Sequence, residues 1–271
     1  MRYWRSTWVI ERSEGDHYQA GRRLFLGLPA FQYAVSTVCL SERSRVPLID
    51  IFNKYGTILM TAMGQTLLLA LYGLFFACII GLIVGIMSVL KNKFCRGVAL
   101  VFVNLIRGVP MIVLAYFIFF GIPFLCNSIM KIGGVTLTAL QAGTICLALN
   151  CGAYMAEIIR AGIQSVDIGQ MEAARSLGLP YWRAMQRVIL PQAIRTMIPS
   201  IINQFIITLK DTSILSVIGF PELVNTAKNV VAATFLSFQT WGIVAVMYLI
   251  VILLLQWAAK VLERRLKYES R

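Results

Sequence analysis

The sequence has few charged residues. Only 14% of its 271 residues are Asp, Glu, Lys or Arg, whereas 58% are hydrophobic. A mean hydropathy of +0.75 lies far outside the range of soluble globular domains and indicates a membrane protein. Histidine is almost absent, and the single His17 lies in a polar N-terminal stretch. This scarcity argues against most zinc sites and against Ser/His/Asp catalysis.

Several motifs are missing as well. The chain contains no GxxxxGK[ST], HExxH or GxSxG sequence, so it lacks a phosphate-binding loop and these hydrolase signatures. No two of the six cysteines have CxxC spacing, and several lie in apolar runs where they act as small hydrophobes. We therefore predict neither a disulfide nor a metal site, and we expect any energy from ATP to come from another polypeptide.

Long apolar runs dominate what is present, and a membrane span needs roughly 20 helical residues. Backbone groups in lipid must be hydrogen-bonded internally, so we predict an all-α polytopic membrane protein with five core helices. The approximate segments are 56–90, 98–120, 137–159, 192–219 and 241–259. The second is interrupted by Arg107 and Pro110. Outer loops are expected at 123–134 and, with one short helix, at 221–239.

The formal net charge of +13 comes from short basic clusters between and after the apolar runs. Lys91, Lys93 and Arg96 follow the first run, and Lys260 and Arg264 follow the last. By the positive-inside rule these clusters mark the cytoplasm, so the C-terminus is predicted to be cytoplasmic. Such placement sets topology and does not indicate a nucleic-acid partner.

The first 50 residues fit this pattern less well. Residues 24–40 are weakly apolar, contain Pro29 and are flanked by arginines. Three interpretations remain open: a sixth, weak N-terminal helix, a targeting segment, or an upstream extension of a chain that starts near 46–51. The late apolar run and the missing small-residue cleavage pattern disfavour a signal peptide.

Gly81 and Gly85 form a GxxxG pair in the first predicted span. Glycines at this spacing let another helix approach closely within a membrane. We interpret the pair as packing within one subunit rather than as a contact between two subunits.

The interior stretch 160–187 is polar and amphipathic, so it is placed outside the lipid. Asp167 is the expected N-cap of a short helix, and Gln170 three residues later is similar to a capping box. Gly178 can end the helix in a left-handed conformation, and Pro180 blocks its continuation. An apolar stripe recurs at helical spacing in Ile168, Met171, Ala174 and Leu177. Such a helix suits a protein groove, although a simple connecting loop is the plainer alternative.

This stretch resembles the EAA signature of permease subunits of bacterial ABC importers. The matching residues are Glu172-Ala173-Ala174, Gly178, Val188 and Leu190-Pro191, with Val188 where isoleucine is usual. Three further stretches resemble the polar amino-acid branch of that family: 107–110, 154–163 and 203–213. The resemblance extends over about residues 50–267.

The resemblance implies the type I ABC importer permease fold and a subunit that carries polar L-amino acids across the bacterial inner membrane. It implies three protein partners: an ABC ATPase dimer, a second permease subunit that is identical or different, and an extracytoplasmic solute-binding protein. No cofactor is expected on this chain, because ATP and Mg act on the ATPase, and the chain itself is not an enzyme. Docking on the ATPase is assigned to Gln170, Glu172, Ala173, Ala174 and Gly178.

We divide the chain accordingly. The resemblance implies nothing for residues 1–50, an N-terminal extension of uncertain structure; 51–267 form a transmembrane permease domain with a coupling loop at 160–191, and 268–271 a tail. The alternative function is an ion-gradient-driven transporter of small polar solutes. No internal repeat supports that alternative, and it would leave the capped helix without a partner. The sequence does not specify which amino acid is carried.

Four ionisable residues lie within the apolar runs, where a charge costs a few kcal/mol or more unless it faces protein or water. We assign Arg107 or Lys210 to the carboxylate of an amino acid and Glu157 or Asp211 to its ammonium group. The alternative is internal pairing, Lys with Asp or Arg with Glu, that only fixes helix packing. Glu222 is assigned to a loop and not to the pathway.

Overall fold

The computed structural model describes residues 48–131 and 133–268, with side chains as far as Val261. The chain divides after Asp50, and residues 51–271 form one compact unit. The interpretations of the first 47 residues and of the segment after Tyr268 lie outside the described residues.

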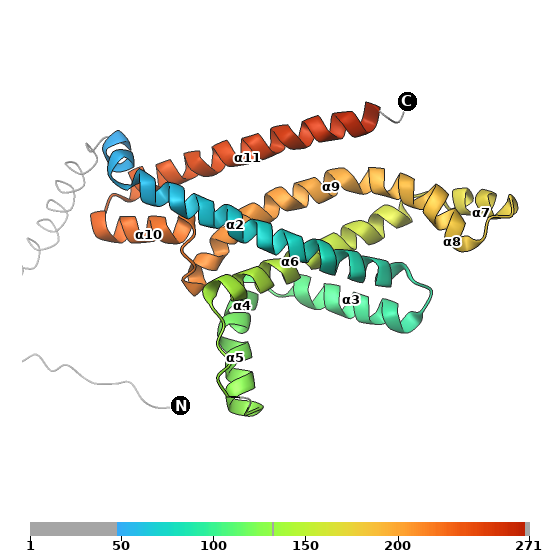
Figure 1. Cartoon of the computed structure of the whole chain (residues 1–271), viewed down its shortest axis with the longest axis horizontal. Helices are drawn as coiled ribbons and strands as arrows, with labels where there is room; N and C mark the ends of the chain where they lie inside the picture. Colours follow the sequence, from blue (N-terminus) through green and yellow to red (C-terminus); the bar gives the residue numbers. More distant parts are fainter. Residues whose placement is uncertain (1–47, 132, 269–271) are drawn as a thin grey trace, which may run out of the picture. The chain divides into compact units, whose positions relative to one another are not determined.

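Five helical runs within the described ranges are long and apolar enough to cross a membrane, as predicted. They are Leu48–Val89, Met111–Ile129, Ala139–Gln164, Tyr181–Ile218 and Ser237–Val261. Figure 1 shows the helices in chain order: α2 (Leu48–Val89), α3 (Lys93–Gly108), α4 (Met111–Tyr116), α5 (Ile122–Phe124), α6 (Ala139–Gln164), α7 (Ile168–Ser176), α8 (Tyr181–Ala184), α9 (Leu190–Asp211), α10 (Leu223–Thr234) and α11 (Ser237–Tyr268).

The second predicted segment is two helices rather than one. The helix stops at Gly108, Val109 is extended at φ −98° and ψ 131°, and α4 starts at Met111. Pro110 explains the break, because a proline disfavours the helical conformation of the residue before it and lacks a backbone N–H.

Pro123 and Pro191 lie within longer helical runs. The first corrects a predicted boundary, because the expected outer loop 123–134 is helical as far as Ile129. The expected coupling loop 160–191 contains α7 and, from Tyr181, the start of the run that continues into α9. A π-helical segment precedes each proline, Phe117–Gly121 before Pro123 and Met185–Ile189 before Pro191. Such wider turns interrupt the regular hydrogen-bond ladder, so a residue without an N–H is tolerated there.

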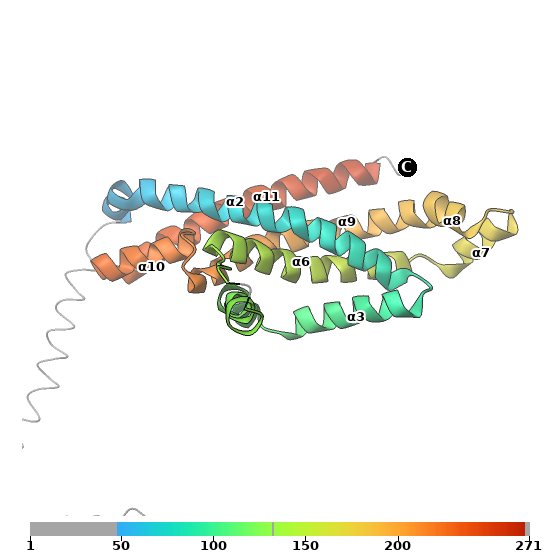
Figure 2. The same ribbon diagram turned by 60° about the horizontal axis from the view of Figure 1, so that its bottom comes forward.

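Helix α6 is the most interior span. In its most apolar stretch 67% of residues are buried, against 28% for α2 and 17% for the Ser237–Val261 span. It packs against α3 and α9, and Figure 2 shows it between them. A Cβ added at Gly81 would lie 2.5 Å from the Cβ of Met155, so α2 also touches α6 at backbone distance. The GxxxG pair therefore packs within the subunit, as interpreted from the sequence.

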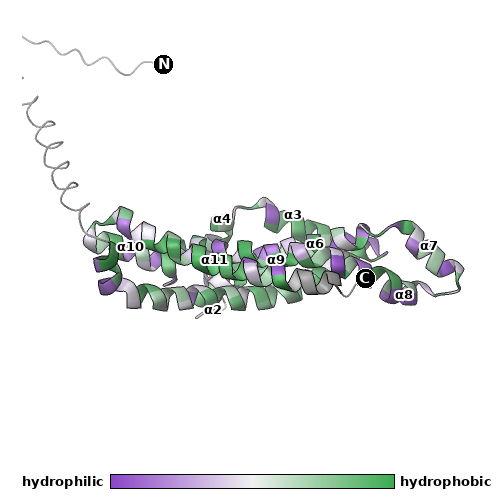
Figure 3. Cartoon of the chain, turned by 90° about the horizontal axis from the view of Figure 1, so that it is seen from above, coloured by the Kyte–Doolittle hydropathy of each residue, from purple (hydrophilic) through white to green (hydrophobic). Residues whose placement is uncertain are grey.

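Different elements lie at the two ends of the compact unit. Figure 1 shows α7, the turn between α2 and α3, and the C-terminal end of α11 at one end, and α10 at the other. Figure 3 shows mostly hydrophobic residues along α2 and a hydrophilic mixture at α7 and α8. The basic turn after α2 and the short helix α7 thus lie on the same side of the spans.

Candidate functional site

A cavity of about 540 Å³ lies where the break between α3 and α4 faces α6 and α9. The break itself supplies part of the wall, in agreement with the rule that non-helical backbone at membrane depth lines a cavity or is buried in protein. We call this space the central cavity. Its lining residues are Arg107, Gly108, Val109, Pro110, Met111, Asn150, Tyr154, Gln204, Ile207, Asp211 and Ile214.

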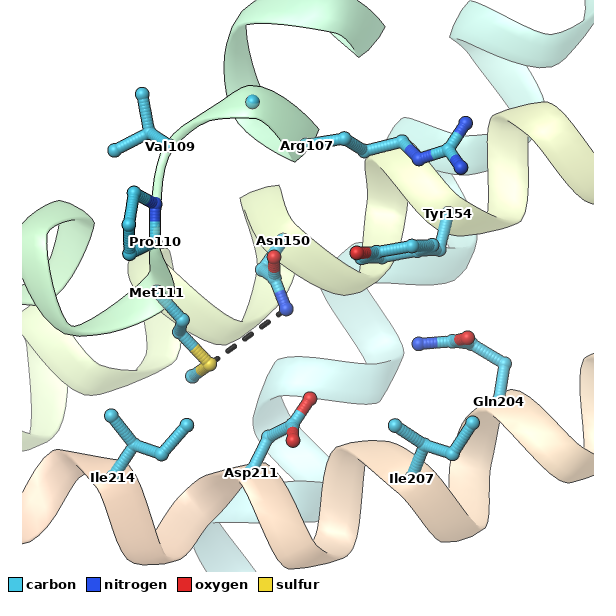
Figure 4. A pocket seen from close by; sticks show the side chains of 11 residues that line it. Arg107, Val109, Pro110, Met111, Asn150, Tyr154, Gln204, Ile207, Asp211 and Ile214 are labelled. Carbon is cyan, nitrogen blue, oxygen red and sulfur yellow. Dashed lines mark hydrogen bonds between the residues drawn. The ribbon is translucent and has the colours of Figure 1, made fainter.

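Polar side chains of α6 and α9 point into the central cavity. Figure 4 shows Asn150 of α6 opposite Gln204 and Asp211 of α9. The guanidinium carbon of Arg107 lies 4.9 Å from the centre of the Tyr154 ring, in a cation–π contact. A cation, an anion and two amides thus line one space, and this set can bind a zwitterion with a polar side chain.

Glu157 lies outside the central cavity. Its carboxylate accepts a 3.1 Å hydrogen bond from Nε of Arg160, pairs with Nη2 of the same arginine, and lies 4.0 Å from Nη1 of Arg107. The assignment of Glu157 to the ammonium group of a substrate stays a prediction. The structure adds the Arg–Glu pairing that the sequence left open.

Lys210 and Asp211 are neighbours in sequence at the end of α9, but they lie on different faces of the helix. Asp211 lines the central cavity, whereas Lys210 is exposed and lines neither of the two cavities described for this chain. The structure thus brings Arg107 and Asp211 to one space and leaves Lys210 and Glu157 outside it.

Helix α7 has the caps expected from its sequence. The Asp167 side chain accepts the N–H of Gly169 at 2.6 Å, which confirms the N-cap. Gly178 has φ +83°, its N–H reaches the carbonyl of Arg175, and the next N–H reaches that of Ala174. These two bonds form a Schellman motif. The side chain of Gln170 contacts Gln192 at 3.5 Å, so the reciprocal capping box is not formed.

The predicted docking residues of α7 are mostly on its free surface. Gln170, Glu172, Ala173 and Gly178 are exposed, whereas Ala174 is buried. Ile168 and Leu177, at the two ends of the apolar stripe, are 76% and 84% exposed. An apolar stripe left open at both ends is consistent with a partner protein that covers it.

Three polar lining residues were not assigned to the pathway from the sequence: Asn150, Tyr154 and Gln204. Asn150 and Gln204 are 8% and 6% exposed. In the sequence, an amide side chain within an apolar run is a signal that could have identified them. Tyr154 had no such signal, because tyrosines commonly anchor membrane interfaces.

Five spans, a polar cavity between three of them, and a capped helix that projects at one end define a membrane-spanning transport subunit. The chain belongs to the family described as binding-protein-dependent transport system inner membrane component, which matches residues 77–268. It is 37% identical over 210 residues to the glutamine transport system permease protein GlnP of Escherichia coli (strain K12), with 78% of this chain and 93% of that protein covered. It is also 37% identical over 220 residues to the probable glutamine ABC transporter permease protein GlnM of Bacillus subtilis (strain 168), covering 81% and 96%.

Solved structures give the same assignment. The fold matches the crystal structure of an amino acid ABC transporter with histidines at a TM-score of 0.74 and 36% identity, covering 81% of this chain and 99% of that one. An inward-facing structure of the methionine ABC transporter MetNI matches at 0.63 and 20% identity, covering 79% and 98%, which supports the fold alone. The predicted type I importer fold and the permease function are confirmed, and the ion-driven alternative is not supported. The chain is a transporter subunit and not an enzyme.

Proposed function

We propose that this permease carries polar amino acids through the central cavity. The observation that carries the proposal is the presence of Arg107 and Asp211 in one space with two buried amides. The names of relatives as glutamine permeases, and of the solved neighbour as an amino acid transporter, support the same cargo class.

The chemistry of the lining suits an α-amino acid. Arg107 offers the planar N–H donors that bind a carboxylate, and Asp211 offers an acceptor for an ammonium group. Desolvating a zwitterion is costly unless both charges find partners, so opposite charges in one cavity lower the barrier to crossing. Asn150 and Gln204 add donors and acceptors for a polar side chain.

Membership of the importer family implies an ATPase subunit and a solute-binding protein as partners. We assign ATPase docking to the exposed surface of α7, with Gln170, Glu172, Ala173 and Gly178 at the contact. The buried Ala174 instead holds α7 in place. ATP and Mg act on the partner, whose closure moves α7 and opens the permease outward, and hydrolysis resets it. The solute-binding protein delivers cargo at the opposite end.

We propose that a second permease subunit packs beside part of α9. Asn203 and Lys210 are both exposed and lie two helical turns apart, so they share one face. A lysine and an amide are costly against lipid, and a second permease with a shared aqueous path would solvate both. This face keeps Lys210 in the proposed pathway.

The inner membrane of a bacterium is the proposed location, with the C-terminus in the cytoplasm. Lys91 lies in the turn before α3 and Lys93 is the first residue of α3, at the same end as α7 and the C-terminal end of α11. The positive-inside rule places that end in the cytoplasm, where the ATPase is.

Uptake by a reconstituted complex tests the cargo and its contacts. We expect proteoliposomes that contain the permease, its ATPase and a solute-binding protein to take up labelled glutamine in an ATP-dependent manner. Asp211→Asn and Arg107→Met should each lower kcat/KM by roughly tenfold or more, since each removes one charge partner. Lys131→Gln, in the outer loop, is the matched control that should leave uptake unchanged. Wild-type rates in both cavity variants would contradict the assignment of these residues.

A further inference from the structure

Arg107 belongs to two cavities. Besides the central cavity, it lines a second space of about 390 Å³, which we call the exit cavity, and it is the one residue that both linings share. Its side chain is 38% exposed, so neither space encloses it fully. The guanidinium therefore stands between the two spaces.

The exit cavity is basic and lies toward the α7 end of the spans. It is bounded by the end of α2, the length of α3 and the last turns of α6. Three arginines line it with a single glutamate, and the polar side chains of Ser88, Asn104 and Gln164 complete its hydrogen-bonding groups. The arginines are Arg96, Arg107 and Arg160. Such a lining attracts a carboxylate that leaves the central cavity.

The Glu157 carboxylate interacts more weakly with Arg107 than with Arg160. Arg160 binds the glutamate through two nitrogens, one of them at 3.1 Å, and also donates to Gln164 at 2.9 Å. Arg107 reaches the same carboxylate only at 4.0 Å. Both Tyr154 and Glu157 are on α6, one helical turn apart, so Arg107 rests along one face of that helix.

We propose that Arg107 is a gate between the central and exit cavities, that Glu157 holds it closed, and that the exit cavity is a transit site for the substrate carboxylate. This inference rests on the proposed amino-acid pathway and adds its inner barrier. Arg160 sets the strength of the gate, because a carboxylate bound to Arg160 is less free to bind Arg107. A substrate carboxylate in the central cavity then displaces Glu157 from Arg107. On passing the gate, the substrate meets Arg96 and Arg160.

Three variants test the gate, because the mechanism gives them opposite effects. Glu157→Gln releases Arg107, so the complex should let iodide pass through the permease in the absence of ATP. Arg160→Gln frees Glu157 to pair fully with Arg107, so KM for ATP-driven glutamine uptake should rise about fivefold. In the double variant the Glu157 carboxylate is gone and cannot hold Arg107, so KM should fall below that of Arg160→Gln and the leak should persist.

The leak is measured as iodide influx into proteoliposomes that contain a quenchable dye, without ATP. Iodide influx should rise about fivefold in Glu157→Gln over the wild-type complex. Lys93→Gln, which removes a positive charge near the same end without lining either cavity, should change neither readout. A double variant no better than Arg160→Gln would mean that Arg160 acts only through packing and would overturn the gate. An unchanged iodide influx in Glu157→Gln would overturn it as well.

The two proposals can fail separately. A wild-type complex that takes up none of a panel of polar amino acids would reject the proposed cargo, while the iodide measurement would still decide the gate. Normal amino-acid uptake combined with no change in the Glu157 and Arg160 variants would reject the gate alone.

Discussion

The phenolic hydroxyl of Tyr248 on α11 donates a 3.4 Å hydrogen bond to the carboxylate of Glu222, a side chain that is 0% exposed at the start of α10. The same carboxylate accepts the N–H groups of Val224 at 2.8 Å and Asn225 at 2.6 Å. The hydroxyl of Thr66 on α2 accepts the N–H of Leu223 at 3.1 Å. One buried polar cluster thus joins α2, α10 and α11 at the end opposite α7.

Replacement of Glu222 should destabilise this end of the protein. Glu222→Ala removes the N-cap of α10 and leaves buried N–H groups without acceptors, so we expect a loss of about 2 kcal/mol or more. Glu222→Gln keeps one acceptor oxygen and should lose less. Thermal unfolding of the detergent-solubilised protein measures both. Equal Tm values for the wild type and the alanine variant would show that the cap contributes nothing to stability.

Glu222 should also make stability depend on pH. Burial raises its pKa above the ordinary glutamate value, and hydrogen bonds from Val224, Asn225 and Tyr248 and the charge of Lys228 only partly oppose that effect. Between the ordinary and the raised pKa the folded state therefore binds more protons than the unfolded state. Stability should fall as pH rises through this window.

The control for this pH dependence is Glu222→Gln, which cannot titrate. Its Tm should lack the fall that the wild type shows as pH rises above the ordinary glutamate pKa. A wild-type Tm that rises over the same interval, in parallel with that of the variant, would assign the dependence to other groups.

Two glycines of α2 form a matched pair for testing helix contact. A Cβ at Gly81 meets the Cβ of Met155 at 2.5 Å, whereas a Cβ at Gly64 meets nothing within 4 Å. Gly81→Ala should therefore destabilise the protein by about 1–3 kcal/mol. Gly64→Ala should be neutral or stabilise it by up to about 1 kcal/mol, since alanine favours helix. Thermal unfolding compares them, and similar Tm values would argue against close contact of α2 with α6.

The left-handed turn at the end of α7 should be needed for coupling. Gly178 has φ +83°, a conformation that asparagine tolerates and a β-branched residue does not. Gly178→Val should leave the protein inserted but abolish stimulation of ATPase activity by the solute-binding protein, whereas Gly178→Asn should retain it. The ratio of stimulated to basal ATPase activity in the reconstituted complex is the measurement. Full stimulation in the valine variant would count against the docking role of α7.

Local patterns predicted a large part of this molecule. Lengths of apolar runs located the spans, and the cap at Asp167 and the turn at Gly178 follow from interactions within a few residues. The error at Pro123 arises because a π-helical segment that accommodates a proline has no clear sequence signal. The break before Pro110 was foreseen as an interruption, but not as two separate helices.

Contacts between helices were harder to predict from the sequence. Asp211 and Lys210 are neighbours in sequence, yet only the aspartate lines the central cavity, because successive residues of a helix point about 100° apart. Glu222 was assigned to a loop, and its loop position hides its burial, which depends on α2 and α11 closing over it.

The sequence by itself determined that this chain spans a membrane, roughly where its spans lie, and that one capped helix projects from them, since hydropathy and capping act over short distances along the chain. Only the tertiary structure decided which charges meet. Arg107 comes from α3, Glu157 and Arg160 from α6, and Asp211 from α9. Their grouping depends on the rotation and depth at which the helices pack, and these are set by contacts such as Gly81 against Met155 rather than by any local pattern.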